Sequence, residues 1–211
     1  NGSPVEMPWL SDVKGLLEAY LGGQAGGAAV ANILYGKVNP SGKLAETMPL
    51  KLADNPSYLN FGGGEKVEYR EGVFVGYRYY DTKEMEVAFP FGYGLSYTSF
   101  AYDNLRISSV NPTEKDTVTV SVDITNTGNV AGKEIVQLYV KDLTGSAIRP
   151  VKELKHFEKQ LIRTGETKTF RFDIDLERDF GFVNEDGKRF LEAGEYHILV
   201  QGQTVKIELI D

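Results

Sequence analysis

The chain has 211 residues, of which 41% are hydrophobic and 25% charged, the composition of a globular protein with a sizeable core. Its formal net charge of −7 and the lack of any Lys or Arg cluster argue against a nucleic-acid partner. It has no cysteine and only two histidines, so we expect no disulfide and no metal site, and no apolar run approaches the ~18 residues of a membrane helix.

The first predicted element is a helix near the start of the chain. The chain opens on Asn1 without an initiator Met or a leader pattern, so we expect further residues upstream. The segment "DVKGLLEAYL" repeats apolar residues at helical spacing and predicts a helix over residues 12–21. Ser11 is the expected cap, and Gly22-Gly23 the expected end. We expect Trp9 to be buried against this helix.

A glycine-rich segment follows, "GGQAGGAAVANILYGKVNPSGK", and it invites comparison with phosphate-binding loops. The Walker pattern fails because Gly36-Lys37 and Gly42-Lys43 are not followed by Ser or Thr, and the G-x-G-x-x-G spacing is absent. The pattern predicts instead a helix over residues 25–36, then a turn over residues 39–42. Its small residues favour close packing against another backbone over ligand binding.

Carboxylates and aromatic residues gather over residues 65–81. The carboxylates are Glu65, Glu68, Glu71 and Asp81, and the aromatics are Tyr69, Phe74, Tyr77, Tyr79 and Tyr80. One interpretation is a sugar site, in which rings stack on the sugar and carboxylates bind its hydroxyls. The favoured one is a solvated loop followed by a buried strand over "GVFVGYRYYD", with a bend at Gly72 or Gly76. That bend would bring Glu71 and Arg78 together as a buried, structural ion pair.

From Phe100 onward the pattern alternates apolar and polar residues with period two. The expected strands lie in "DTVTVSVDIT", "KEIVQLYVKD", "TKTFRFDIDL", "GEYHILVQG" and "TVKIELI", and turn residues separate them. We expect about seven strands and an all-β, immunoglobulin-like sandwich. His156 and His197 fall in such strands and are expected to be residues of the sandwich faces rather than catalytic bases.

The same motifs carry a family resemblance. The segments "NGSPVEMPW", "GGQAGGAAVANILYGKVNPSGKLAETMP", "VEYREGVFVGYRYYD" and "FPFGYGLSYTSFAY" resemble, in this order, the later part of the second domain of glycoside hydrolase family 3. The alternating remainder resembles the fibronectin type III-like domain that follows it. The resemblance implies part of an α/β sandwich over residues 1–100, then the fibronectin type III-like sandwich over residues 101–211. The most similar members are bacterial β-glucosidases.

The family's activity implies a retaining, exo-acting glycosidase that removes terminal non-reducing β-D-glucosyl residues without a cofactor. Its nucleophile is an Asp of a barrel domain, and its acid/base Glu precedes the segment that "NGSPVEMPW" resembles. Neither motif occurs here, and a barrel alone needs ~250 residues. We therefore assign no catalytic, cofactor-binding or metal-binding residue and leave the substrate-binding residues unknown.

Three organisations follow from this assignment. The first is a C-terminal fragment whose barrel and N-terminal part of the α/β domain lie upstream, the fragment supporting and shaping the active site for a β-glucoside or oligosaccharide. The second places those parts on another chain. The third is a stand-alone, non-catalytic β-sandwich module for carbohydrate or protein binding, and the row of aromatics on one sheet face that would mark it is not evident in the sequence.

Overall fold

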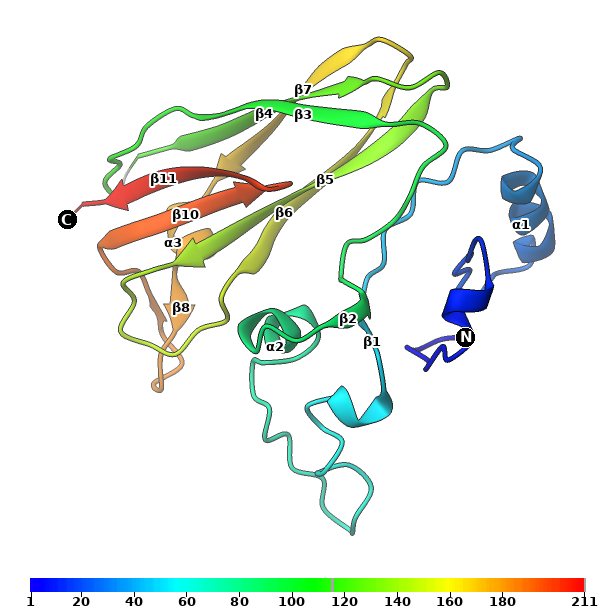
Figure 1. Ribbon diagram of the computed structural model, residues 1–211. Coiled ribbons are helices and arrows are strands. Elements are labelled where there is room, and N and C mark those ends of the chain that lie inside the picture. Colours follow the sequence, from blue (N-terminus) through cyan, green and yellow to red (C-terminus); the bar gives the residue numbers. More distant parts are fainter. Residues whose placement is uncertain (115, 211) are drawn as a thin grey trace. The chain divides into compact units, whose positions relative to one another are not determined.

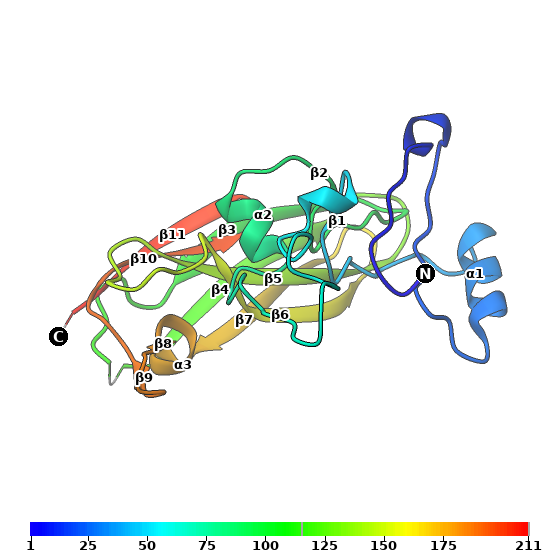
Figure 2. The ribbon, with the colours of Figure 1, turned by 90° about the horizontal axis from the view of Figure 1, so that it is seen from below.

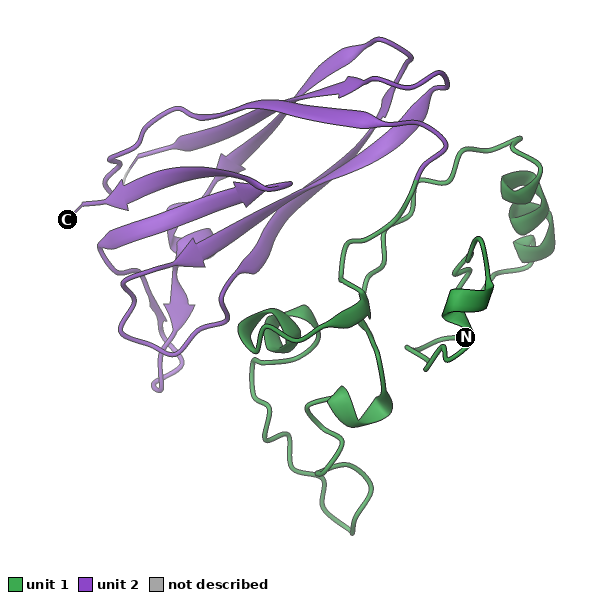
Figure 3. Ribbon diagram, viewed as in Figure 1, with its two compact units in different colours: residues 1–95 green, residues 96–211 purple. Residues whose placement is uncertain are grey.

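The computed structural model describes residues 1–114 and 116–210, and the chain divides into two compact units, Asn1–Leu95 and Ser96–Asp211 (Figure 3). The domain boundary that the sequence predicts after residue 100 stays a prediction, because compact units are not the same as the family's domains. No helix in the described residues is both long and apolar enough to span a membrane. Each unit is described by itself below.

Unit 2, Ser96–Asp211, is a sandwich of two antiparallel sheets (Figures 1 and 2). The four-stranded sheet has the order β11-β10-β5-β6, and the three-stranded sheet the order β3-β4-β7. The strands are β3 (Phe100–Ile107), β4 (Val118–Asn126), β5 (Gly132–Asp142), β6 (Glu153–Ile162), β7 (Thr167–Ile174), β10 (Gly194–Val200) and β11 (Gln203–Leu209). Between β7 and β10 lie α3 (Leu176–Phe180), β8 (Phe182–Val183) and β9 (Arg189–Phe190). The predicted all-β sandwich is confirmed.

The alternation of the sequence explains why these strands face each other. On β4, the side chains of Val118, Val120, Val122 and Ile124 are all 0% exposed, whereas the residues between them face outward. They pack with apolar residues of β5, β7, β10 and β11 into one core. Since burying one such side chain contributes about 1.5–3 kcal/mol, this core is the main source of stability in unit 2.

Unit 1, Asn1–Leu95, has little regular structure. Its elements are η1 (Leu10–Asp12), α1 (Gly26–Leu34), β1 (Met48–Pro49), η2 (Leu52–Asp54), α2 (Tyr77–Thr82) and β2 (Val87–Phe89). The strands β1 and β2 pair with each other, and Met48 of β1 is buried. The predicted helix over residues 25–36 is confirmed as α1, and Gly36 closes it in the left-handed region at φ +68°.

The helix predicted over residues 12–21 is wrong. Only the short turn η1 forms, and residues 13–20 contain no helix. A helix of this length is marginal until its apolar face is packed, and Gly15 weakens it further. Leu16 and Leu17 are 46% and 37% exposed, so nothing in the described chain supplies that packing. Trp9 was expected to be buried against this helix and is instead 43% exposed.

The strand predicted over residues 72–81 is also wrong. Gly72 and Gly76 both have positive φ, so the predicted bend is confirmed, but the chain then turns into the helix α2 rather than a strand. Gly76 has φ +57° and ψ −136°, a conformation that only glycine adopts without strain. One residue of α2, Tyr80, is buried and anchors the helix in unit 1.

Asn126, at the end of β4, is 0% exposed, and its side chain holds the turn into β5. Its amide nitrogen donates to the carbonyls of Val130 and Ile162, each at 2.9 Å. Its amide oxygen accepts from the Thr98 hydroxyl at 2.6 Å and from the Gly128 N–H at 3.1 Å.

Because Asn126→Leu removes four hydrogen bonds, of which the one to the Ile162 carbonyl is buried and the others are part-buried, it should lower the free energy of unfolding of unit 2 by about 2–3 kcal/mol. The neighbouring half-buried Thr125 also makes a side-chain hydrogen bond, to Thr167, and Thr125→Val is the control, expected to cost about 0.5 kcal/mol or less. Urea unfolding followed by fluorescence measures both, and equal effects of the two changes would contradict this account of Asn126.

Candidate functional site

The glycine-rich segment is the first candidate, and the structure gives it a structural role. The Lys43 ammonium donates to the Gly94 carbonyl at 2.8 Å, and the Leu44 N–H donates to the Tyr93 carbonyl at 2.8 Å. A Cβ on Gly94 would lie 2.4 Å from the carbonyl oxygen of Gly42, so only glycine fits there. The end of the segment is therefore clamped to the loop over residues 92–94.

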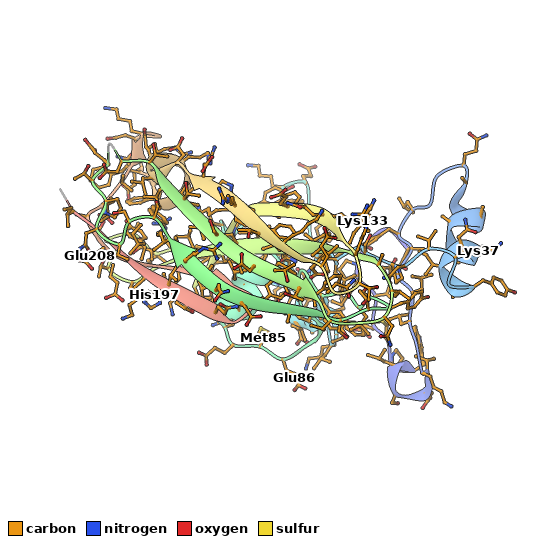
Figure 4. All side chains as sticks on the ribbon, turned by 90° about the horizontal axis from the view of Figure 1, so that it is seen from above. Lys37, Met85, Glu86, Lys133, His197 and Glu208 are labelled. Atoms are coloured by element: carbon orange, nitrogen blue, oxygen red, sulfur yellow. The ribbon has the colours of Figure 1, made fainter. Side chains whose placement is uncertain are left out.

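The helix α1, at the start of the same segment, has no such partner. No α1 residue is buried, and a Cβ at Gly26 or Gly27 would meet no atom within 4 Å. Lys37, just beyond α1, is exposed, and Figure 4 shows its position at this part of the chain. The predicted close packing against another backbone is therefore wrong within this chain.

The cluster of carboxylates and aromatics divides into two parts. Glu68 forms an exposed ion pair with Arg70, with Oε2 and Nη2 at 2.6 Å, and the Tyr69 ring is 81% exposed. The aromatic side chains of α2 instead pack inside unit 1. The Tyr77 and Phe91 centroids are 4.8 Å apart, and those of Tyr79 and Tyr80 are 5.5 Å apart. The structure does not gather the cluster into one site.

The ion pair predicted between Glu71 and Arg78 is absent from the described residues. Glu71 Oε2 is buried without a hydrogen-bond partner in the described chain. The Arg78 guanidinium lies 5.6 Å from the centroid of the Tyr77 ring, on the same helix. The reason is the turn into α2, which carries Arg78 along a helix instead of back along a strand.

Sequence reasoning missed Glu46, a carboxyl whose pKa the fold raises. Burial is the largest cause of the raised pKa, and the nearby Glu18 adds to it. The adjoining Thr47 is 4% exposed, and its hydroxyl has no hydrogen-bond partner in the described chain. A raised pKa suits a general acid. The nearby Glu18 is a second carboxyl, and its Oε1 accepts the Tyr20 N–H at 2.7 Å. Its only signal in the sequence is its place just after the "PSGKL" turn.

The two histidines lie where the strands were predicted, and each contacts a carboxylate. His156 Nε2 on β6 lies 2.7 Å from Asp179 Oδ2, and His197 Nε2 on β10 lies 2.8 Å from Glu195 Oε1. Asp179 is 2% exposed and also accepts two bonds from Arg178, at 2.9 and 3.0 Å. Burial alone would raise the pKa of Asp179, but the bonds from Arg178 and His156 outweigh it and lower the pKa. The lowered pKa favours the ionised form of Asp179 at neutral pH, and this carboxylate anchors α3.

Neither unit presents a metal site in the described residues. A shallow hollow on unit 2 is lined mainly by carboxylates, Glu114, Asp116, Asp173, Asp175 and Glu177. No group of three or more His, Cys, Asp or Glu among the described residues has the arrangement of a metal site.

Both parts of the chain match known families. Residues 1–97 match the glycosyl hydrolase family 3 C-terminal domain, and residues 134–204 match a fibronectin type III-like domain. These matches confirm the family resemblance drawn from the sequence motifs.

Among similar proteins, thermostable beta-glucosidase B of Acetivibrio thermocellus is 57% identical over 202 residues, 95% of this chain and 27% of that protein. The exo-alpha-(1->6)-L-arabinopyranosidase of Bifidobacterium longum is 46% identical over 203 residues, 95% of this chain and 26% of that protein. The crystal structure of beta-glucosidase from Kluyveromyces marxianus in complex with glucose has a TM-score of 0.92 and 45% identity, covering 100% of this chain and 26% of that one. The chain thus spans about a quarter of the length of these relatives.

The two histidine pairs allow a matched comparison of stability against pH. Asp179→Ala should lower the free energy of unfolding at pH 7 by about 3 kcal/mol, because it removes a buried partner of His156 and Arg178. Glu195→Ala removes a half-exposed partner of His197 and Lys206 and should cost clearly less than Asp179→Ala, because solvent screens this pair.

The pKa of Asp179 is lowered, so its contribution is complete above the ordinary Asp value near ~4 and is lost as the pH falls through the lowered value. The difference between Asp179→Ala and the unmodified chain should therefore shrink below pH ~4. Thermal unfolding from pH 7 to pH 2 measures it, and a difference that stays constant over this range would refute the role of Asp179 as an anion.

Proposed function

Because the chain belongs to glycosyl hydrolase family 3, with the family's C-terminal domain followed by a fibronectin type III-like domain, we propose that it is the C-terminal part of a retaining, exo-acting β-glucosidase. The whole enzyme would hydrolyse terminal non-reducing β-D-glucosyl residues. This chain would support and shape the active site rather than carry out catalysis. β-Glucosidases predominate among the relatives, and the arabinopyranosidase shows that other sugars have to be tested.

The carboxylates of the chain support a non-catalytic role. A retaining glycosidase needs two carboxyl groups about 5–5.5 Å apart, one as nucleophile and one as acid/base. The carboxylates over residues 65–68 are exposed, and Glu68 is paired with Arg70. Asp179 is held as an anion inside the sandwich. Glu46 has the raised pKa of an acid but no matching nucleophile motif beside it.

The observation that carries the proposal is the uncovered helix α1. Its nine residues, "GGAAVANIL", include no charged side chain, and none of them is buried. Asn32 is its one polar side chain, and a helix of this composition is normally covered by other parts of a protein. Leu21 and Tyr35, just outside its ends, are 82% and 83% exposed. Such a surface fits a chain that packs against more protein than it contains.

The missing cover is proposed to be the catalytic barrel and the N-terminal part of the α/β domain, upstream in the same protein or on another chain. The relatives are about four times as long as this chain, which supports an upstream position. The substrate would be a β-glucoside or an oligosaccharide bound by the complete enzyme. A stand-alone binding module accounts for unit 2 but leaves the exposed apolar surface of unit 1 unexplained.

The purified 211-residue chain is expected to release no nitrophenol from aryl β-glucosides above the uncatalysed rate, because no carboxylate in it lies in a motif that matches either catalytic role. The full-length protein from the same gene is the positive control. Turnover by the short chain that Glu46→Gln abolishes would overturn this expectation and make Glu46 a catalytic acid.

Unit 1 alone, residues 1–95, is expected not to unfold cooperatively, because its apolar surface around α1 stays in water. Unit 2 alone, residues 96–211, carries its own core and should show one cooperative transition. Circular dichroism during heating and size-exclusion chromatography compare the two. A monodisperse, cooperatively melting unit 1 would remove the main support for a missing partner.

A further inference from the structure

One stretch of unit 1 is exposed along its whole length. Residues 61–70, "FGGGEKVEYR", are all exposed and belong to the connection between η2 and α2 (Figure 1). Bends run over residues 61–65, and residues 66–69 contain no helix, strand or turn. Exposed loop tips rich in small and polar residues are the preferred places for proteases to cut folded proteins. This stretch is called the 61–70 loop.

Hydrogen bonds hold the 61–70 loop only at its ends. The Phe61 N–H donates to the Ser57 carbonyl at 2.9 Å. At the other end, the Arg70 N–H donates to the Glu68 carbonyl at 3.0 Å. Between these two bonds, residues 62–67 make no hydrogen bond to any described part of the chain. A protease binds its substrate as an extended segment, so it cuts fastest where few bonds have to open first.

Lys66 is the residue of the loop that suits a trypsin-like protease. Such proteases select a substrate Lys or Arg by taking its cationic side chain into a pocket that holds a carboxylate. Lys66 is exposed, and among the described residues it forms no ion pair. Arg70 is held instead, because its Nε and Nη2 lie 2.7 and 2.6 Å from Glu68 Oε2. The cut is therefore expected after Lys66.

We propose that the 61–70 loop is a processing site, at which a trypsin-like protease hydrolyses the peptide bond between Lys66 and Val67. The C–N bond breaks, and one water molecule supplies the hydroxyl of the new Lys66 carboxyl group and a hydrogen of the new Val67 amino group. No other reactant is needed. The products are residues 1–66 and residues 67–211.

The two products should stay together, because the contacts that hold unit 1 join residues from the two sides of the loop. β1 lies before the loop and pairs with β2, which lies after it. The Leu44 N–H donates to the Tyr93 carbonyl at 2.8 Å, and the Leu44 carbonyl accepts the Gly92 N–H at 2.8 Å. The bond from Lys43 to Gly94 joins the same two segments. Processing therefore opens the loop without releasing either part.

Other exposed lysines of unit 1 compete with Lys66 for the protease. Lys37 lies in a closed turn, because the Val38 N–H donates to the Asn32 carbonyl at 3.0 Å. Lys14 has no such restraint, since residues 15–20 after it contain no helix or strand. In the 211-residue chain, a trypsin-like protease is therefore expected to cut after Lys14 as well as after Lys66.

The proposed function distinguishes these two sites in the full-length enzyme. Val13, Leu16 and Leu17 beside Lys14 are apolar and 37–46% exposed, so the upstream part would cover them. Residues 62–66 are three glycines, a glutamate and a lysine, which need no cover. The inference rests on the proposed function in this respect alone.

The first test is limited digestion of the 211-residue chain with trypsin, followed over time by mass spectrometry. The cut after Lys66 should be at least about tenfold faster than the cut after Lys133, which is also exposed but lies on β5, paired with β6. Lys66→Gln should remove the fast cut, and the matched control Lys133→Gln should leave it. An intact Lys66–Val67 bond when the bond after Lys133 is cut overturns the proposal, as does a faster cut after Arg70.

The digested chain also tests whether the products stay together. Residues up to Lys66 and residues from Val67 onward should elute together in size-exclusion chromatography in native buffer and separately in urea. Separate elution in native buffer contradicts the role of the contacts between the two sides of the loop.

The same digestion of the full-length enzyme separates this proposal from the proposed function. The bond after Lys66 should be cut there as in the short chain, whereas the cut after Lys14 should be several-fold slower. Protection of Lys66 in the full-length enzyme overturns the processing site. Equal cutting after Lys14 in the two proteins, with Lys66 cut in both, counts against the cover expected from the proposed function and leaves the processing site supported.

Discussion

The two sheets of unit 2 depend on one constraint, which is that every second residue of the central strands must be sealed between them. β4 meets it with four side chains at 0% exposure, and Phe170 and Ile198 meet it from the two sheets. A shift of register by one residue would turn all of these side chains to water and bring Thr, Ser and Asp into the core. The turns, caps and ion pairs of unit 2 add detail to an arrangement that this core already determines.

Unit 1 has no comparable core, and this explains where sequence reasoning succeeded. The strands of unit 2 were predictable because each buries one face within the chain itself. The helix predicted over residues 12–21 has a regular apolar pattern as well, but the surface that its pattern is meant to cover is not in the described chain. An apolar periodicity indicates that one face of an element is to be buried. The element forms only where a packing partner covers that face.

The strand expected over residues 72–81 failed for a local reason. Valine and tyrosine favour strands, but Gly76 reverses the chain direction and lets Tyr77–Thr82 close into a helix. The ion pair predicted between Glu71 and Arg78 depended on the strand and failed with it. Only the family motifs could indicate a candidate site, because the sequence does not show how far apart the carboxylates lie in the fold. The pKa of Glu46 is raised because the fold buries this carboxyl, and the residues next to Glu46 in the sequence do not indicate that burial.

The buried charges of unit 2 lie at the ends of the sandwich rather than in its middle. Asp142 with Arg149, and Asp179 with His156, join loops and the short helix α3 to the strands. Replacing such pairs by apolar residues is often neutral or stabilising, so stability alone is a weak reason for their presence. Their directional hydrogen bonds and ion pairs fix segments that have too few apolar side chains to be fixed by hydrophobic packing. At the β5–β6 loop, the bonds of Arg149 to Asp142 and to the Phe180 carbonyl fix the backbone while the neighbouring side chain, Ile148, faces solvent.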